Sequence, residues 1–299
     1  MKRAVSVSIG SSRRDKVVEI DLLGERVRLE RIGTDGDMEK AARLYQELDG
    51  KVDAFGVGGA DLGLRIDKRW YPLYSVRPMV RFISKTPVAD GEGLKNTLEA
   101  RLASFIDLKM GAHINPRRVL VVTAVDRWGM ARSFVDEGYE CTFGDMMFAL
   151  SLPVPLHSVR SLKILAALLM PIAGRLPFKW VYPTGEKQEK RAPKWEKWYQ
   201  WAMVIAGDAH YIKRHMPDRL EGKVIATNTT TTEDVDLFRR AGVKALFTST
   251  PVLDGRSFGT NLMEAGLIAA SGKGRRLTID ELSEILDRLG MQPHLQELN

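Results

Sequence analysis

Residues suited to ligand binding follow five apolar segments of the chain, each directly after its segment ends. They are Asp126, Arg127, Gly129, Asp145, Asp208, His210, Asn228, Thr229 and Thr250. In an open parallel sheet, ligands bind outside the carboxyl ends of the strands, near the point where the strand order reverses. We therefore predict one crevice in which His210 contacts a substrate and the other residues bind a cofactor. The alternative is that each cluster only turns the chain and caps the next helix.

Two further loops carry candidate binding residues. Lys95 and Asn96 begin a predicted helix after a loop with two glycines, and a cation there gains nothing from the helix dipole. Both are therefore candidates to bind a substrate, and a solvated lysine is the alternative. The loop 254–261, with Gly259 and Thr260, leads into a helix whose free amides favour a phosphate or carboxylate. The alternative there is a capped loop packed under the sheet.

Several other chemistries lack their sequence signatures. His210 and His215 are five residues apart, which does not place them on one helix face, and the single cysteine, Cys141, falls in a predicted buried strand. There is no P-loop and no G-x-S-x-G elbow. The G-x-G-x-x-G fingerprint also fails, because Asp126 stands where its second glycine would be. We therefore expect no metal site and no cysteine nucleophile.

Continuous apolar runs predict the strands that position these residues. They cover 119–123, 140–143, 203–206, 224–226 and 245–248, and helical spacing occurs between them at 128–137, 210–215 and 233–240. Strands that alternate with helices indicate an open parallel sheet. Nearer the N-terminus, strand-like segments at 3–9, 16–22, 26–32 and 53–57 and helical segments at 37–48 and 93–108 indicate a mixed α/β unit.

The predicted fold class is α/β, with an N-terminal mixed α/β domain and a Rossmann-like open parallel sheet that carries a basic helical insertion. We expect a substrate domain over 1–115, a Rossmann-like domain over 116–275 with the insertion at 150–201, and a C-terminal helix and tail over 276–299. The chain has 299 residues, of which 44% are hydrophobic and 28% charged. This length and composition are typical of a globular protein of about two domains.

The net charge of +7 is concentrated in the insertion. Between Pro155 and Trp201 there are nine Lys or Arg and three Glu, together with four of the six tryptophans. Three interpretations stay open: a buried interdomain or homodimer helix with a solvated basic tail, an amphipathic element over 156–201 that contacts anionic lipid, and a cap over an acidic substrate. No motif for sequence-specific nucleic-acid binding accompanies the charge.

The compartment is predicted from cysteine usage and from the apolar segments. A single cysteine excludes an internal disulfide, and the start of the chain lacks the apolar run of a signal peptide. The longest apolar stretch, 162–176, is shorter than the roughly 20 residues of a spanning helix and contains three residues that oppose insertion, namely Lys163, Pro171 and Arg175. We expect a cytoplasmic protein without a transmembrane helix.

Eight segments spread over nearly the whole chain resemble the bacterial quinate 5-dehydrogenase family. They are SVSIGSSRRDK, DGEGLKNTLE, VTAVDRWGMA, FGDMMFALSLPVPL, YPTGEKQEKR, IAGDAHYI, TNTTTTEDV and GRSFGTNLMEA. The resemblance implies a substrate domain, a nicotinamide domain, and hydride transfer at a ring hydroxyl assisted by a Lys and Asp pair. Ser6 and Ser8 are similar to the Ser-x-Ser that binds the substrate carboxylate in that family. Lys95 and Asp90 are the nearest match to the catalytic pair.

We therefore expect an oxidoreductase that uses NAD or NADP and acts on a small hydroxylated acid, quinate-like or shikimate-like. Lys95 and Asp90 would move the hydroxyl proton, because removing a hydride from an alcohol also requires the proton to leave. One alternative is a non-catalytic ligand-binding or membrane-surface protein that uses the insertion. Another is a Rossmann-like lyase or transferase that uses the same crevice.

Overall fold

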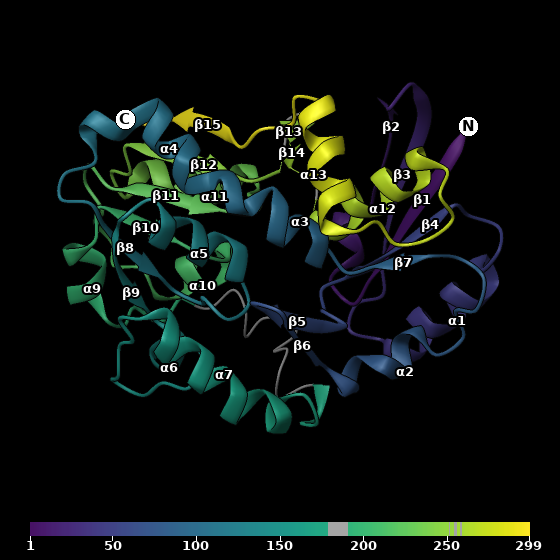
Figure 1. The fold of residues 1–299 in the computed structure, drawn as a ribbon, viewed down its shortest axis with the longest axis horizontal. Coiled ribbons are helices and arrows are strands. Elements are labelled where there is room, and N and C mark those ends of the chain that lie inside the picture. The colour runs from purple at the N-terminus through teal and green to yellow at the C-terminus, as the bar shows by residue number, and fades with distance from the viewer. Residues whose placement is uncertain (179–190, 251, 254–255, 258) are drawn as a thin grey trace. The chain divides into compact units, whose positions relative to one another are not determined.

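A computed structural model describes residues 1–178, 191–250, 252–253, 256–257 and 259–299 (Figure 1). The chain divides into two compact units. The first comprises Met1–Leu94, Leu169–Gln188 and Gly259–Gly290, and the second comprises Lys95–Leu168, Glu189–Phe258 and Met291–Asn299. Each unit contains a sheet in which most strands are parallel, so the predicted α/β class with a Rossmann-like sheet is confirmed.

The sheet of the first unit has the order β2-β3-β1-β4-β7, and only β2 is antiparallel to its neighbour. The strand-like segments predicted at 3–9, 16–22, 26–32 and 53–57 are therefore strands of one sheet, in which the second and third form an antiparallel hairpin. A smaller hairpin, β5-β6, follows the fourth strand. The elements of this part of the chain are β1 (Lys2–Ser8), η1 (Ser12–Arg14), β2 (Lys16–Leu22), β3 (Glu25–Gly33), α1 (Met38–Leu48), β4 (Ala54–Gly58), β5 (Gly63–Ile66), β6 (Arg69–Pro72), η2 (Tyr74–Val76), α2 (Arg77–Val80) and β7 (Val88–Ala89).

Helix α12 (Thr260–Ser271) packs on β1, β3 and β4 of this first sheet (Figure 1). The sequence places the same helix in the 116–275 domain, and the structure differs because ten of its twelve residues are buried in the first unit. Close approach requires a small residue: a Cβ at Gly266 would lie 2.7 Å from Leu29 Cδ2. Helix α13 (Ile279–Arg288) follows, and Thr278 and Glu281 form a capping box at its start.

The sheet of the second unit has the order β9-β8-β10-β11-β12-β15. The five strands predicted from apolar runs are all present and mutually parallel. The sixth, β15 (His294–Glu297), is antiparallel and falls in the predicted tail, since its four residues form no apolar run. The other strands and the helices between them are β8 (Arg118–Val121), α5 (Trp128–Asp136), β9 (Glu140–Phe143), α6 (Asp145–Phe148), β10 (Val204–Ala206), α10 (Ala209–His215), β11 (Val224–Thr227), α11 (Thr232–Arg240), β12 (Ala245–Thr248), β13 (Val252–Leu253) and β14 (Arg256–Ser257).

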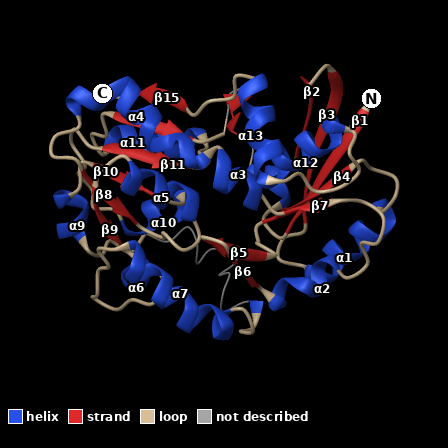
Figure 2. Ribbon diagram, viewed as in Figure 1, coloured by secondary structure: helices blue, strands red, loops and turns tan. Residues whose placement is uncertain are grey.

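Helices cover both faces of this second sheet (Figure 2). On one face, Tyr199, Ile212 and Phe238 from helices join the buried cluster around Leu120 and Ile205. On the other, α4 (Leu102–Met110) lies against β12, where the rings of Phe105 and Phe247 meet edge to face at 6.0 Å. Since successive strand residues point to opposite faces, a strand covered on both must be apolar throughout.

One predicted helical region differs in detail. The helix expected at 93–108 is divided into α3 (Glu92–Thr97), η3 (Glu99–Arg101) and α4, with a tight turn at Glu99, whose side chain enters a buried ion pair. A further short turn, η4 (Gly111–His113), ends this region.

The insertion is described in part, through α7 (Val159–Ala173) and α9 (Glu196–Trp201). Residues 179–190, with Trp180, Lys187 and Lys190, lie outside the described residues. Across the part of the chain that is described, no helix has both the length and the apolarity needed to cross a bilayer.

Candidate functional site

The carboxyl ends of β8 and β10 form the topological switch point of the second sheet. The chain passes from β8 to β9 on one side of β8, and β10 then pairs on its other side. Loops that leave adjacent parallel strands in opposite directions open a crevice at such a point. The side chains found there come from Asp126 and Arg127 after β8 and from Asp208 after β10.

Lys95 and Asp126 form an ion pair at this edge. Lys95 Nζ lies 2.9 Å from Asp126 Oδ1, and the two side chains are 9% and 29% exposed. Burial alone would raise the pKa of Asp126, but the positive charges of Lys95 and Arg127 outweigh it, so the pKa of this carboxyl is lower than usual. Asp126 is therefore an ionised carboxylate beside a cation, and its side chain is more exposed than that of Lys95.

Arg127 is buried behind this pair and contacts three carboxylates. Its side chain is 6% exposed, and it lies 2.6 Å from Glu99, 2.7 Å from Asp208 and 3.3 Å from Asp126. Together with Lys95, the cluster holds two cations and three carboxyl groups. One carboxyl must therefore be neutral if the buried charges are to balance.

Glu99 is the carboxyl best suited to be neutral. Its side chain is fully buried, and its Oε2 atom has no hydrogen-bond partner among the described residues. Burial raises the pKa of Glu99 to about 7, although Arg127 and Lys95 act in the opposite direction. A second buried oxygen, Thr123 Oγ1 just after β8, also has no hydrogen-bond partner within the described part of the chain.

The pKa of Asp208 is shifted in the opposite direction from that of Glu99. It caps α10 by accepting a hydrogen bond from the amide of His210 at 2.9 Å, and its other oxygen accepts from Arg127 and from Asn228 Nδ2 at 3.2 Å. Burial would raise its pKa, but Arg127, His210 and the hydrogen bond from the His210 amide hold the pKa of Asp208 well below the usual range. It therefore stays ionised and fixes Arg127 in place.

Asp145, which the sequence predicts to bind a cofactor, accepts hydrogen bonds from the loop that follows β8. Its carboxylate accepts hydrogen bonds from the amides of Val125 at 2.8 Å and Ala124 at 3.2 Å, and burial raises its pKa to about 6. A dinucleotide site requires these amides for the pyrophosphate and the acid for the ribose. In this chain the acid and the amides satisfy each other, so the turn after β8 does not fit a pyrophosphate.

Gly129, expected to bind the cofactor, has a packing role in the structure. A Cβ at this position would lie 2.1 Å from the carbonyl oxygen of Lys95 and 3.0 Å from the Cα of Asn96. The absence of a side chain lets α5 approach the segment that carries Lys95. Gly129 thus brings Lys95 within reach of Asp126, which no spacing in the sequence indicated.

The remaining predicted residues of the second unit lie near the same edge. His210 is exposed on the first turn of α10, and Thr250 Oγ1 donates to the carbonyl of Asn228 at 3.1 Å. Thr229 follows Asn228 in the loop after β11, and Asn96 follows Lys95 on α3. The structure therefore brings the strand-end residues to one edge of the sheet.

The predicted residues of the first unit have partners within that unit. Ser6 accepts from Asn261 Nδ2 at 3.1 Å, and Ser8 accepts from Arg31 at 3.0 Å. Asp90, proposed as the partner of Lys95, accepts hydrogen bonds from the Leu62 amide at 2.7 Å and from Arg276 at 3.1 Å.

Two further predicted residues, Gly259 and Thr260, begin α12 of the same unit. In the loop 254–261, residues 254–255 and 258 lie outside the described residues. Asp126 is a carboxylate that the structure does place beside Lys95.

Sequence reasoning missed Glu99. The available signal was its position four residues after Lys95 on a predicted helix, next to the apolar stripe of Leu94, Leu98 and Leu102. A charged residue beside an apolar stripe is a candidate for a buried ion pair.

Comparisons with known proteins give two family matches. The model described as Domain of unknown function (DUF8754) matches residues 93–298, and the model described as Domain of unknown function (DUF8753) matches residues 3–90. A search of curated proteins returned no match.

Three of the similar solved structures are two malic enzymes and a sugar-binding protein. The NAD-dependent malic enzyme of Thermotoga maritima is 14% identical, with a TM-score of 0.40 over 95% of this chain and 75% of that one. A putative malic enzyme is 13% identical, with a TM-score of 0.39 over 95% and 77%. A glucose-galactose binding protein from Geobacillus stearothermophilus is 10% identical, with a TM-score of 0.37 over 99% and 97%. Such low TM-scores assign no ligand or reaction, so we argue function from the side chains.

Proposed function

We propose that this chain, which belongs to the family described as Domain of unknown function (DUF8754), is an enzyme that moves a proton to or from a hydroxyl group of a small hydroxylated acid. The observation that carries the proposal is the Lys95 and Asp126 pair at the switch point of the second sheet. Ligands of open parallel sheets bind at such points, and side chains with perturbed pKa values there are candidates for proton transfer.

The two members of the pair have different tasks. Asp126 is ionised and the more exposed of the two, so its carboxylate accepts the hydroxyl proton of the substrate. Lys95 is a cation 2.9 Å away that donates a hydrogen bond to the substrate oxygen and stabilises the negative charge that develops on it. His210, exposed beside Asp208 on α10, is the residue we assign to the substrate carboxylate.

Arg127, Glu99 and Asp208 position this pair without contacting the substrate. Arg127 is held by Glu99 and Asp208, and its positive charge lies 3.3 Å from the second oxygen of Asp126, which favours the ionised form of that carboxylate. Glu99 sets the charge of the cluster: two cations and three carboxylates give −1 when it is ionised and zero when it is protonated. Its pKa of about 7 lets that charge change near neutral pH.

The resemblance to the quinate 5-dehydrogenase family implies a specific reaction. This reaction is the oxidation of a quinate-like or shikimate-like acid with NAD or NADP. The resemblance and the Rossmann-like sheet support it. The turn after β8 does not fit a pyrophosphate, because Asp145 occupies the amides of Ala124 and Val125. We therefore derive no step through a dinucleotide. A lyase or transferase that uses the same crevice needs a proton transfer at the substrate without a dinucleotide.

Turnover of hydroxylated acids by variants of the pair tests the proposal. Quinate, shikimate and open-chain hydroxy acids are incubated with the full chain, with and without NAD and NADP, and products are followed by NMR and by absorbance of the reduced cofactor. Asp126→Asn is expected to lower kcat about 100-fold or more, since positioned acid–base groups contribute about 10²–10⁴-fold. Asp136→Asn, on the exposed face of α5, is the matched control and should retain activity. Equal turnover by Asp126→Asn and wild type would refute the assignment.

A second candidate is a protein that binds an anionic membrane surface through α7. Ile164 and Leu168 are 52% and 66% exposed on successive turns, and Arg160 and Lys163 lie on the same helix. An exposed apolar stripe with flanking cations is typical of interfacial helices. Flotation with phosphatidylserine vesicles should be salt-sensitive and lost in Leu168→Gln if this candidate is correct. Flotation that is absent from the wild type eliminates it.

A further inference from the structure

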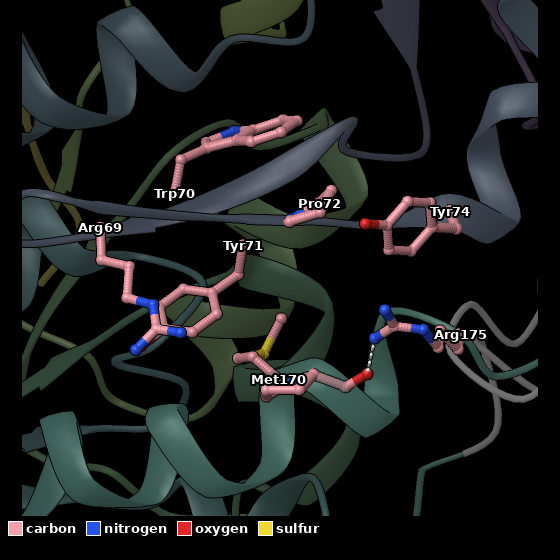
Figure 3. A pocket seen from close by; sticks show the side chains of 8 residues that line it. Arg69, Trp70, Tyr71, Pro72, Tyr74, Met170 and Arg175 are labelled. Atoms are coloured by element: carbon pink, nitrogen blue, oxygen red, sulfur yellow. Dashed lines mark hydrogen bonds between the residues drawn. The ribbon is translucent and has the colours of Figure 1, made fainter.

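A small pocket in the first unit lies beside β6 and the segment 170–175. Its volume is about 140 Å³, and none of the eight residues that line it is acidic. Figure 3 shows Arg69 and Tyr71 on the same side of β6 as Met170, whereas Trp70 points to the opposite side. This alternation follows from the period of two along a strand.

Apart from Arg69 and Arg175, the residues that line this pocket are aromatic or apolar, and packing holds them in place. Tyr71 and Met170 are only 6% and 7% exposed. The amide of Tyr74 donates to the carbonyl of Gly174 at 2.8 Å, and a Cβ at Gly174 would lie 2.3 Å from the carbonyl oxygen of Pro72. The backbone of segment 170–175 is therefore fixed against β6 and the turn after it.

The volume fits one six-membered ring. An apolar cavity of about 150 Å³ in a protein is known to hold benzene. Tyrosine rings and a methionine sulfur make favourable contacts with an aromatic ring at its face and edge. A puckered ring with several hydroxyl groups would have to lose water from each of them against these walls.

Two guanidinium groups lie at the pocket. Arg69 stands 4.9 Å from the centre of the Tyr71 ring, and Arg175 stands 5.0 Å from that of Tyr74 while donating to the carbonyl of Pro171 at 2.6 Å (Figure 3). Neither arginine has an ion pair with a carboxylate within the residues that the structure describes. Guanidinium groups bind carboxylates through paired hydrogen bonds, so the pocket is complementary to an anion.

We propose that this pocket binds an aromatic monocarboxylate with a single ring. The ring contacts Tyr71 and Met170, and Arg69 and Arg175 supply the positive charge that attracts the carboxylate. This binding is separate from the proton-transfer site of the second unit and does not depend on it.

Titration of the full chain with benzoate by calorimetry and NMR tests the proposal. We expect saturable binding of one benzoate per chain. Benzamide, which has the same shape but no charge, should bind about tenfold more weakly or worse, and Arg69→Gln and Arg175→Gln should each weaken benzoate by a similar factor. Arg77→Gln is the matched control, because its guanidinium lies 4.3 Å from the Tyr74 ring but does not line the pocket.

Three results would overturn the proposal: no saturable benzoate binding, equal affinity for benzamide and benzoate, or equal losses in Arg77→Gln and Arg175→Gln. Circular dichroism checks that each variant folds. If an arginine variant does not fold, the comparison of benzoate with benzamide on the wild type still decides. Quinate that binds more tightly than benzoate, with the loss confined to Arg69→Gln and Arg175→Gln, would show that the ligand class is wrong.

Discussion

Replacing Glu99 with glutamine should reduce the loss of stability that the wild type shows as the pH rises from about 4.5 to about 7. Burial raises the pKa of this carboxyl from 4.5 to about 7. A group whose folded pKa exceeds its unfolded pKa stabilises the fold fully below the unfolded value, and this contribution is lost as the pH rises through the folded value. At 1.36 kcal/mol per pKa unit, the contribution is about 3 kcal/mol.

Urea denaturation followed by circular dichroism at pH 5, 6, 7 and 8 measures this effect. Between pH 5 and 8, the free energy of unfolding of the wild type falls as the Glu99 contribution is lost, whereas Glu99→Gln has no such contribution to lose. Glu264, buried in the first unit with a pKa of about 7, has the same sign of effect. Glu264→Gln is therefore a positive control in the first unit, and it should also reduce the loss of stability between pH 5 and 8. If Glu99→Gln and the wild type lose equal stability between pH 5 and 8, Glu99 does not titrate as we infer.

Two further predictions concern the same cluster. Arg127→Leu leaves three buried or part-buried carboxylates without their common cation and should cost about 3–5 kcal/mol, whereas Arg132→Leu, in an exposed pair on the helix that begins after Arg127, should cost less than about 1 kcal/mol in urea titrations. Equal costs would contradict the role of Arg127. Gly129→Ala should destabilise the chain by about 1–3 kcal/mol by displacing the Lys95 segment, whereas Gly111→Ala meets no atom closer than 3.7 Å. Thermal unfolding compares the two, and a smaller loss for Gly129→Ala would be the contrary result.

The strands of the second unit could be predicted because each is buried on both faces. Leu120 packs in the cluster on one face of the sheet, and Phe247 meets Phe105 on the other. Such strands must be continuous apolar runs, which are visible in the sequence. The strand β15 could not be predicted in this way, because it joins the edge through backbone hydrogen bonds and none of its four residues is buried.

The place of α12 could not be predicted either. Its residues indicate a buried helix, but a helix that is apolar on most sides can pack on any sheet. The sequence order favoured the second sheet, whereas the structure packs it on the first through Gly266 and Leu29. Chain order is a guide only where connections are short and return to the same sheet.

For the candidate site, the sequence by itself determined the residues that leave the ends of parallel strands, among them Asp126, Arg127 and Asp208. Position after an apolar strand is a local property, and the parallel arrangement then gathers these residues at one edge. Only the tertiary structure decided their partners: Lys95 with Asp126, and Glu99 with Arg127. The physical reason is that pairing depends on how closely two helices approach, and here that approach depends on one glycine, Gly129, more than thirty residues from Lys95 in the chain.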